Sequence, residues 1–136
     1  MRCVLDAAPA MDSAVAKALN EGGIADITTT GRNSGLPRRI EIGFHSFDGK
    51  HYITGRPGRK RDWLANMSAN PEFTLHLKRG LQADVSTTAE LLTDPEEREA
   101  ALRLILESWD NSPEKIDHII GRWVAGAPLI RFEVKG

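Results

Sequence analysis

Residues 38–54 read RRIEIGFHSFDGKHYIT, and this stretch decides the fold. Apolar and polar side chains alternate through its first half, which is the pattern of a β-strand with one buried face. The dipeptide Asp48-Gly49 is a favoured two-residue hairpin turn, because both positions tolerate left-handed backbone angles. We therefore expect the strand Arg38–Phe47 to return as an antiparallel partner over His51–Thr54.

Helix and strand signals flank this hairpin on both sides. Runs of β-branched and alternating residues indicate strands, whereas a capping residue followed by proline and acidic residues indicates the start of a helix. The expected strands are Ile24–Thr30, Arg38–Phe47, His51–Thr54, Glu72–Leu77, Leu81–Leu92 and Ala127–Val134, and the expected helices are Ser13–Asn20, Asp62–Asn70, residues 93–107 and Ser112–Ile120. Antiparallel hairpins with peripheral helices predict an α+β fold, and six strands in so short a chain predict a small barrel or a strongly bent sheet.

The length and composition are those of one globular domain. A chain of 136 residues and 15.0 kDa can bury a sizeable core without disulfides. We expect residues 1–12 to form a leader and residues 13–136 to form the single domain. The only cysteine, Cys3, falls in that leader, so the sequence predicts neither an internal disulfide nor a cysteine-based metal site. The apolar runs are too short to span a bilayer, and we expect a cytoplasmic protein.

Positive charge is concentrated in one segment, residues 55–61, which reads GRPGRKR. The net charge of the chain is only −1, which argues against a general nucleic-acid binder and favours a small anionic ligand. Loop N–H groups, the start of the following helix and the cationic side chains together could bind a phosphate or a polycarboxylate. The alternatives are a solvated basic loop and a hook for the DNA minor groove. The hook is disfavoured, because such hooks lie in extended disordered segments and this loop lies between a strand and a helix.

A second polar segment, residues 28–39, reads TTTGRNSGLPRR and combines a turn with further arginines. The four histidines lack the paired spacing of a zinc site, and the chain shows no nucleophile motif. We expect His45 and His51 to form a surface pair across the hairpin. Glu41 lies on the polar face of its strand, where it could transfer a proton, anchor a substrate or simply form a surface ion pair.

The segments TTTGRNSGLPRRIEIGF, DGKHYITGRPGRKRDWLANMSANP and EFTLHLK together resemble the flavin/deazaflavin-dependent oxidoreductases. This family includes the deazaflavin-dependent nitroreductases and the F420H2-dependent quinone reductases. The resemblance runs from about Ile24 to Glu97 and continues more weakly to the final strand. It implies a split β-barrel of the FMN-binding, pyridoxamine-phosphate-oxidase-like type, frequently a homodimer, that binds coenzyme F420 or, in related branches, FMN.

The resemblance also implies where the cofactor would lie. The basic loop would hold the phosphate of the cofactor tail, and the turn and strand before it would lie beside the tail and the ring. The residues implied for the tail are Thr54, Gly55, Arg56, Pro57, Gly58, Arg59, Lys60, Arg61 and Trp63. The residues implied near the ring are Arg32, Asn33, Arg38, Ile40, Glu41 and Ile42, with Glu41 also the candidate proton donor.

A deazaflavin carries the hydride itself, so the protein needs to supply only binding, orientation and electrostatics. The lack of a catalytic triad or a metal set in the sequence is expected for such an enzyme. We therefore expect an oxidoreductase that transfers hydride between F420 and a small unsaturated or electron-poor substrate. The alternatives are an FMN-dependent oxidoreductase of the same fold and a non-catalytic carrier of a phosphorylated flavin-type cofactor.

Overall fold

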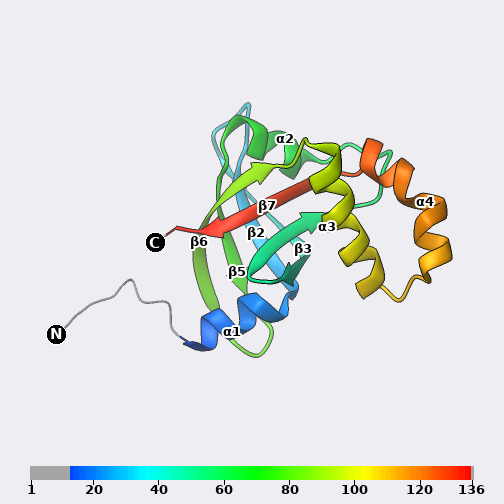
Figure 1. Ribbon diagram of the computed structural model, residues 1–136. Coiled ribbons are helices and arrows are strands. Elements are labelled where there is room, and N and C mark those ends of the chain that lie inside the picture. The colour runs from blue at the N-terminus through cyan, green and yellow to red at the C-terminus, as the bar shows by residue number, and fades with distance from the viewer. Residues whose placement is uncertain (1–12, 136) are drawn as a thin grey trace.

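Antiparallel strands close into a barrel in the order β2-β3-β4-β7-β6-β5 (Figure 1). The structure is a computed structural model that describes residues 13–135, so the expected leader lies outside the described residues. The strands are β2 (Gly23–Thr30), β3 (Pro37–Phe47), β4 (Lys50–Thr54), β5 (Glu72–Leu77), β6 (Ala83–Leu91) and β7 (Leu129–Val134), and the helices are α1 (Ser13–Glu21), α2 (Asp62–Ala69), α3 (Pro95–Ser108) and α4 (Pro113–Gly126). The predicted α+β barrel is confirmed.

The β3–β4 hairpin turns at the predicted dipeptide. Asp48 and Gly49 both have left-handed backbone angles, with φ values of 52° and 76°, as a two-residue hairpin turn requires. The resulting register places Ser46, and not His45, opposite His51. Because successive side chains of a strand point to opposite faces, the two histidines lie on opposite faces of the sheet. The predicted cross-strand histidine pair is therefore wrong.

The interior of the barrel is closed at its two ends by α1 and α2, which lie at the bottom and the top of Figure 1. Leu19 of α1 and Trp63 and Met67 of α2 belong to the same buried cluster as the strand residues Ile27 and Ile53. Complete burial of an aliphatic or aromatic side chain contributes about 1.5–3 kcal/mol, so these anchors hold both helices firmly against the barrel. Helix α2 thereby becomes a fixed wall beside the basic loop.

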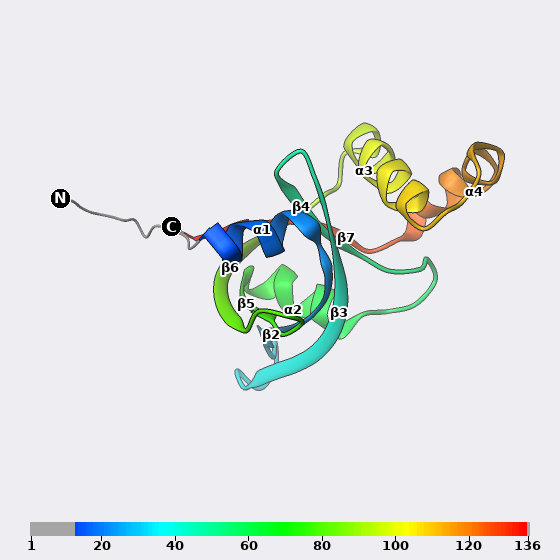
Figure 2. The same ribbon diagram turned by 90° about the horizontal axis from the view of Figure 1, so that it is seen from below.

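Helices α3 and α4 form a second layer outside the barrel (Figure 2). Their apolar faces pack on β4 and β7 through a cluster that includes Leu102, Ile105, Ile120, Tyr52 and Leu129. None of the described helices is long and apolar enough to cross a membrane.

Helices α3 and α4 begin where their capping residues and prolines predict, but α4 ends later than the sequence predicts. The side chains of Asp94 and Ser112 accept hydrogen bonds from backbone N–H groups three residues later, at 3.0 and 3.2 Å, and each is followed by proline. Helix α4 continues beyond the expected end at Ile120 to Gly126, because Trp123 buries its ring in the cluster with α3. Strand β6 begins at Ala83 rather than at Leu81.

Strand β3 is paired unequally on its two edges. One edge pairs with β2 from Pro37 to Phe44, but the other pairs with β4 only from His45 to Phe47. Along most of its length β3 therefore offers an open edge to the region between the basic loop and α2.

Candidate functional site

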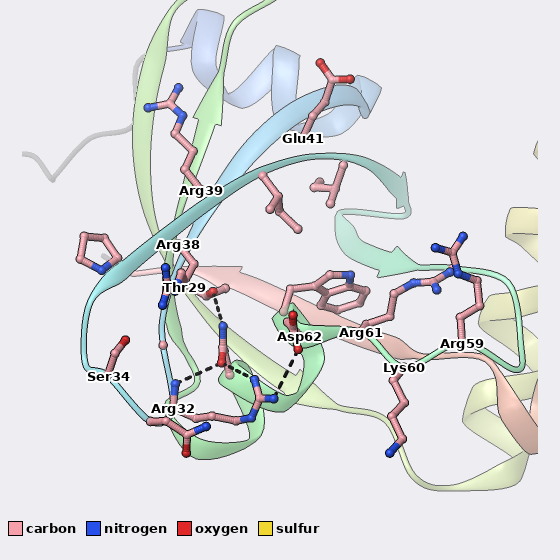
Figure 3. A pocket seen from close by; sticks show the side chains of 18 of the residues that line it. Thr29, Arg32, Ser34, Arg38, Arg39, Glu41, Arg59, Lys60, Arg61 and Asp62 are labelled. Atoms are coloured by element: carbon pink, nitrogen blue, oxygen red, sulfur yellow. Dashed lines mark hydrogen bonds and ion pairs between the residues drawn. The ribbon is translucent and has the colours of Figure 1, made fainter.

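A pocket of about 920 Å³ opens beside the free edge of β3. Its walls come from β3, the turn between β2 and β3, the loop between β4 and α2, and the first turns of α2 (Figure 3). The predicted site residues that line it are Arg32, Asn33, Arg38, Ile40, Glu41, Ile42, Thr54, Gly55, Arg59, Lys60, Arg61 and Trp63. The other described residues of the loop, Arg56, Pro57 and Gly58, lie outside the lining. The structure thus brings together residues from two separate segments of the sequence.

The basic loop forms one side of this pocket. Arg59 and Lys60 are exposed, and Arg38 of β3 faces the same space from the other side (Figure 3). Gly58 has a φ of 89°, a left-handed conformation that suits glycine, so the loop can turn sharply just before its cations. The N-cap residue of α2 is Arg61, whose side chain makes no capping hydrogen bond to the first turn. Free N–H groups and cations at a helix start are the elements of an anion site.

Arg61 folds back over its own loop. A Cβ atom on Gly55 would lie only 2.5 Å from the Arg61 guanidinium, so a larger residue at this position would displace the end of the Arg61 side chain. The same guanidinium donates a hydrogen bond of 3.4 Å to the carbonyl of Arg56. The contact orders the loop in the free protein and leaves Arg61 half-buried at the pocket wall.

Asn66 of α2 ties the β2–β3 turn to the floor of the pocket. Its side-chain oxygen accepts hydrogen bonds from the backbone N–H and the guanidinium of Arg32, at 3.1 and 2.9 Å. Its amide nitrogen donates to the buried hydroxyl of Thr29, also at 3.1 Å. Arg32 further pairs with Asp62 at 3.3 Å, but the Asp62 side chain is 90% exposed. Because exposed ion pairs contribute little, Asn66 is the stronger tether.

The opposite wall is apolar. Ile40 and Ile42 lie opposite Ile27 and Ala25 in the β2–β3 register, and their side chains therefore point to the barrel side of β3. Ile40 remains 39% exposed because none of the described strands covers it there. An apolar wall facing a cationic loop suits a ligand with a flat ring at one end and an anion at the other.

Glu41 contributes to the lining, but its carboxylate points away from the pocket (Figure 3). Its carboxylate accepts a hydrogen bond of 2.5 Å from Lys78, which also pairs with Asp26 at 2.8 Å. The hydrogen bond from Lys78, followed by the one from Arg39, lowers the pKa of Asp26. Glu41 therefore belongs to an ion-pair network on the outer face of the barrel. This placement argues against Glu41 as a proton donor to a ring held in the pocket.

Sequence reasoning missed eight residues of the lining, namely Thr29, Gly31, Ser34, Pro37, Arg39, Gly43, Asp62 and Asn66. The helix spacing held a usable signal, because Asp62 and Asn66 are four residues apart and so share one face of α2. Their common partner, Arg32, lies about thirty positions earlier, and only the folded chain shows that contact. Among the residues from 13 to 135, no three histidine, cysteine or acidic side chains are grouped so as to hold a metal ion.

The donor set fits a phosphorylated flavin-type cofactor. Arginine and lysine side chains and loop N–H groups bind phosphate, and the isoleucine wall offers a surface for an aromatic ring. The described lining holds only two acids, Asp62 and the outward-pointing Glu41, against six cations, Arg32, Arg38, Arg39, Arg59, Lys60 and Arg61. This excess of positive charge suits a ligand that carries more than one negative charge.

Comparison with solved structures shows the fold. An FAD-binding protein from Mesorhizobium loti is 17% identical with a TM-score of 0.56, and the alignment covers 93% of this chain and 90% of that one. An F420-H2 dependent reductase is 22% identical with a TM-score of 0.58, covering 83% and 94%. A structure described as a domain-swapped dimer is 24% identical with a TM-score of 0.58, covering 82% and 80%. Comparison with curated proteins gives no match.

The sequence itself gives the family. The F420H(2)-dependent quinone reductase family matches residues 1–119, which is most of the chain. The match agrees with the closed barrel and with the cationic pocket. As its name states, the family uses F420H2, the reduced form of the deazaflavin F420. The chain therefore belongs to the F420H2-dependent quinone reductases, a family of F420-dependent oxidoreductases.

Proposed function

We propose that the protein binds F420 in the pocket beside β3 and transfers hydride between this cofactor and a small, unsaturated or electron-poor substrate. The proposal rests on one observation: the cationic loop and the apolar wall face each other across one pocket of about 920 Å³. The reduced cofactor supplies a hydride, and the remaining work of the protein is to bind, orient and exclude water.

The tail of the cofactor would be held by the loop. Arg59, Lys60 and Arg61 offer charge-assisted hydrogen bonds to a phosphate, and Arg38 approaches from β3. Arg56, Pro57 and Gly58 would act by shaping the loop, since they lie outside the pocket lining. Asn33 and Arg32 would border the tail from the β2–β3 turn.

The ring would lie against Ile40 and Ile42, with Trp63 forming the floor at the start of α2. The open edge of β3 gives unpaired backbone N–H and C=O groups, which suit the polar rim of a flavin-type ring. Hydride transfer to a quinone or an enone also needs a proton. Water is the simplest source, because the Glu41 carboxylate is paired with Lys78 on the other face.

The test is a titration with oxidised F420 and, separately, with FMN, followed by absorbance and fluorescence. Binding of F420 in the micromolar range or tighter is expected, and failure of both cofactors to bind would overturn the proposal. Preference for FMN would favour the FMN-dependent alternative. Turnover of reduced F420 with quinones, enones and nitro compounds then separates an enzyme from a carrier, which would bind the cofactor and reduce none of them.

Charge reversal separates the anion site from a merely solvated loop. The double variant Arg59→Glu/Lys60→Glu is expected to weaken F420 binding at least about thirtyfold, since each charge-assisted bond contributes roughly 1–3 kcal/mol. Its melting temperature should barely change, because both side chains are exposed. The matched control is Lys115→Glu/Arg122→Glu, which makes the same charge change at exposed positions of α4 outside the pocket lining. Equal affinities in the two variants would return the loop to a solubility role.

We further propose that the protein acts as a cytoplasmic homodimer. The similarity to a domain-swapped dimer supports the second part. Size-exclusion chromatography with light scattering, where a mass near 30 kDa is twice that of the chain of 15.0 kDa, tests it. A mass of one chain at micromolar concentration would contradict it.

A further inference from the structure

Arg98 is a half-buried cation that is bound only by carbonyl groups. Its guanidinium donates to the carbonyls of Leu92 and Val124 at 2.9 Å, of Ala127 at 2.5 Å and of Trp123 at 3.4 Å. Among the described residues, no carboxylate forms an ion pair with it. Trp123 and Val124 belong to the last turn of α4, whose carbonyls carry the negative end of the helix dipole, and the Trp123 carbonyl also accepts a hydrogen bond from the Ala127 N–H. Arg98 therefore joins α3 to the C-terminal end of α4.

The segment that Arg98 holds is also the support of the basic loop. The carbonyl of Pro128, next to Ala127, accepts a hydrogen bond of 2.5 Å from the hydroxyl of Thr54, which directly precedes the loop. The same threonine lies opposite Leu129 in the β4–β7 pairing. Residues 126–129 thus form a junction that fixes the point where the loop leaves the barrel.

A second contact reaches the middle of the loop. A Cβ atom on Gly126, the last residue of α4, would lie 3.4 Å from the Cβ of Pro57. The end of α4 and the loop therefore lie side by side, as Figures 1 and 2 both show. A Cβ at position 126 would be in van der Waals contact with Pro57, so a larger, branched side chain there would meet the loop.

We infer that Arg98 is a positioning residue for the anion site, and that it acts through the α4–β7 junction to hold the loop Gly55–Arg61 in its binding conformation. The inference rests on the proposed function, because it assigns the loop to the phosphate of the cofactor. Arg98 itself does not line the pocket. Its loss would free the Ala127 and Pro128 region, and the loop cations would then be less well aligned on a phosphate.

The test compares two ligands, F420 and the same deazaflavin ring with its sugar chain but without the phosphate and tail. Dissociation constants are measured by fluorescence for the wild type, Arg98→Met and Arg98→Lys. Arg98→Met is expected to weaken F420 binding at least tenfold and to change binding of the phosphate-free compound less than twofold. Arg98→Lys should recover part of the loss, because it keeps the charge but not the planar fork that reaches several carbonyls.

A second variant tests the same path without removing a buried cation. Gly126→Val adds a Cβ in contact with Pro57 and two methyl groups beyond it, and we expect it to weaken F420 binding, again with little effect on the phosphate-free compound. Gly121→Val is the matched control, because no atom lies within 4 Å of a Cβ added at this position of the same helix. If Arg98→Met fails to fold, the comparison of Gly126→Val with Gly121→Val tests the inference in its place.

The outcomes separate the two proposals. Failure of the wild type to bind F420 would overturn the proposed function and this inference with it. If the wild type, Arg98→Met and Gly126→Val bind F420 with equal affinity, the inference alone is overturned. An equal loss for both ligands would also overturn it, since Arg98 would then act on the whole pocket and not on the phosphate site.

Discussion

Replacement of Asn66 by leucine removes three hydrogen bonds from the floor of the pocket while nearly keeping the volume of the side chain. Asn66 is only 3% exposed, and both the Thr29 hydroxyl and the Arg32 N–H lose their partner in the variant. A buried polar group left without a partner costs about 1–3 kcal/mol, so the free energy of unfolding should fall by about 3 kcal/mol. With an m value of about 1.5 kcal/mol/M, the midpoint of urea unfolding falls by about 2 M.

Urea unfolding followed by tryptophan fluorescence measures this loss, since Trp63 lies three residues before Asn66 on α2. The decisive control is the double variant Thr29→Val/Asn66→Leu. Thr29→Val replaces the hydroxyl by a methyl group of the same shape, so the double variant leaves no unpaired hydroxyl at 29 and should cost at least about 1 kcal/mol less than the sum of the two single variants. A loss below about 1 kcal/mol for Asn66→Leu, or strict additivity in the cycle, would refute the assignment of Asn66 as the tether of the β2–β3 turn.

Three further predictions concern one pocket residue and two positions of the β3–β4 hairpin. Asp62→Asn should change the free energy of unfolding by less than about 1 kcal/mol, because the carboxylate is 90% exposed, yet it should tighten F420 binding by removing an acid from the pocket; weaker binding in a titration would contradict this. Gly49→Ala should destabilise the protein by about 1 kcal/mol or more in urea, because its φ of 76° strains any residue with a Cβ, and an unchanged midpoint would exclude that strain. Burial lowers the pKa of His51, so the unfolded chain takes up the proton more readily; stability is full above about pH 6.5 and is lost as the pH falls through the lowered pKa. The drop in melting temperature from about pH 7.5 to 5.5 should therefore be smaller in His51→Gln than in the wild type, and an equal drop would show that His51 does not contribute.

Much of the barrel could be read from local patterns. Alternation gave β3, the Asp48-Gly49 dipeptide gave its turn, and capping residues followed by proline gave the starts of α3 and α4. Helix ends were harder, because α4 continues past Ile120 for the sake of a tertiary contact by Trp123. The faces of His45 and His51 depend on a register that shifts by one residue with the turn, and composition does not determine it.

The positive charge of the site could be predicted from the sequence, but the contacts that hold its residues in place could not. The cations of residues 55–61 stand in one run, so their clustering needs no folding to be seen. The contacts that fix their position join distant parts of the chain, as Asn66 to Arg32 and Pro128 to Thr54 do. Arg98 binds backbone carbonyls among the described residues, and backbone carbonyls belong to every residue type, so no sequence pattern could reveal its partners.

The open edge of β3 gives the protein its own reporter of ligand binding. Along Arg38–Gly43 the amides that point away from β2 have no strand partner among the described residues, so they should exchange their hydrogen with solvent rapidly. A ring seated against Ile40 and Ile42 would cover these amides and slow their exchange, while amides of the β5–β6 pair would serve as an internal standard. Any compound that protects this one row of amides can thus be recognised as a ligand of the pocket before its reaction is known.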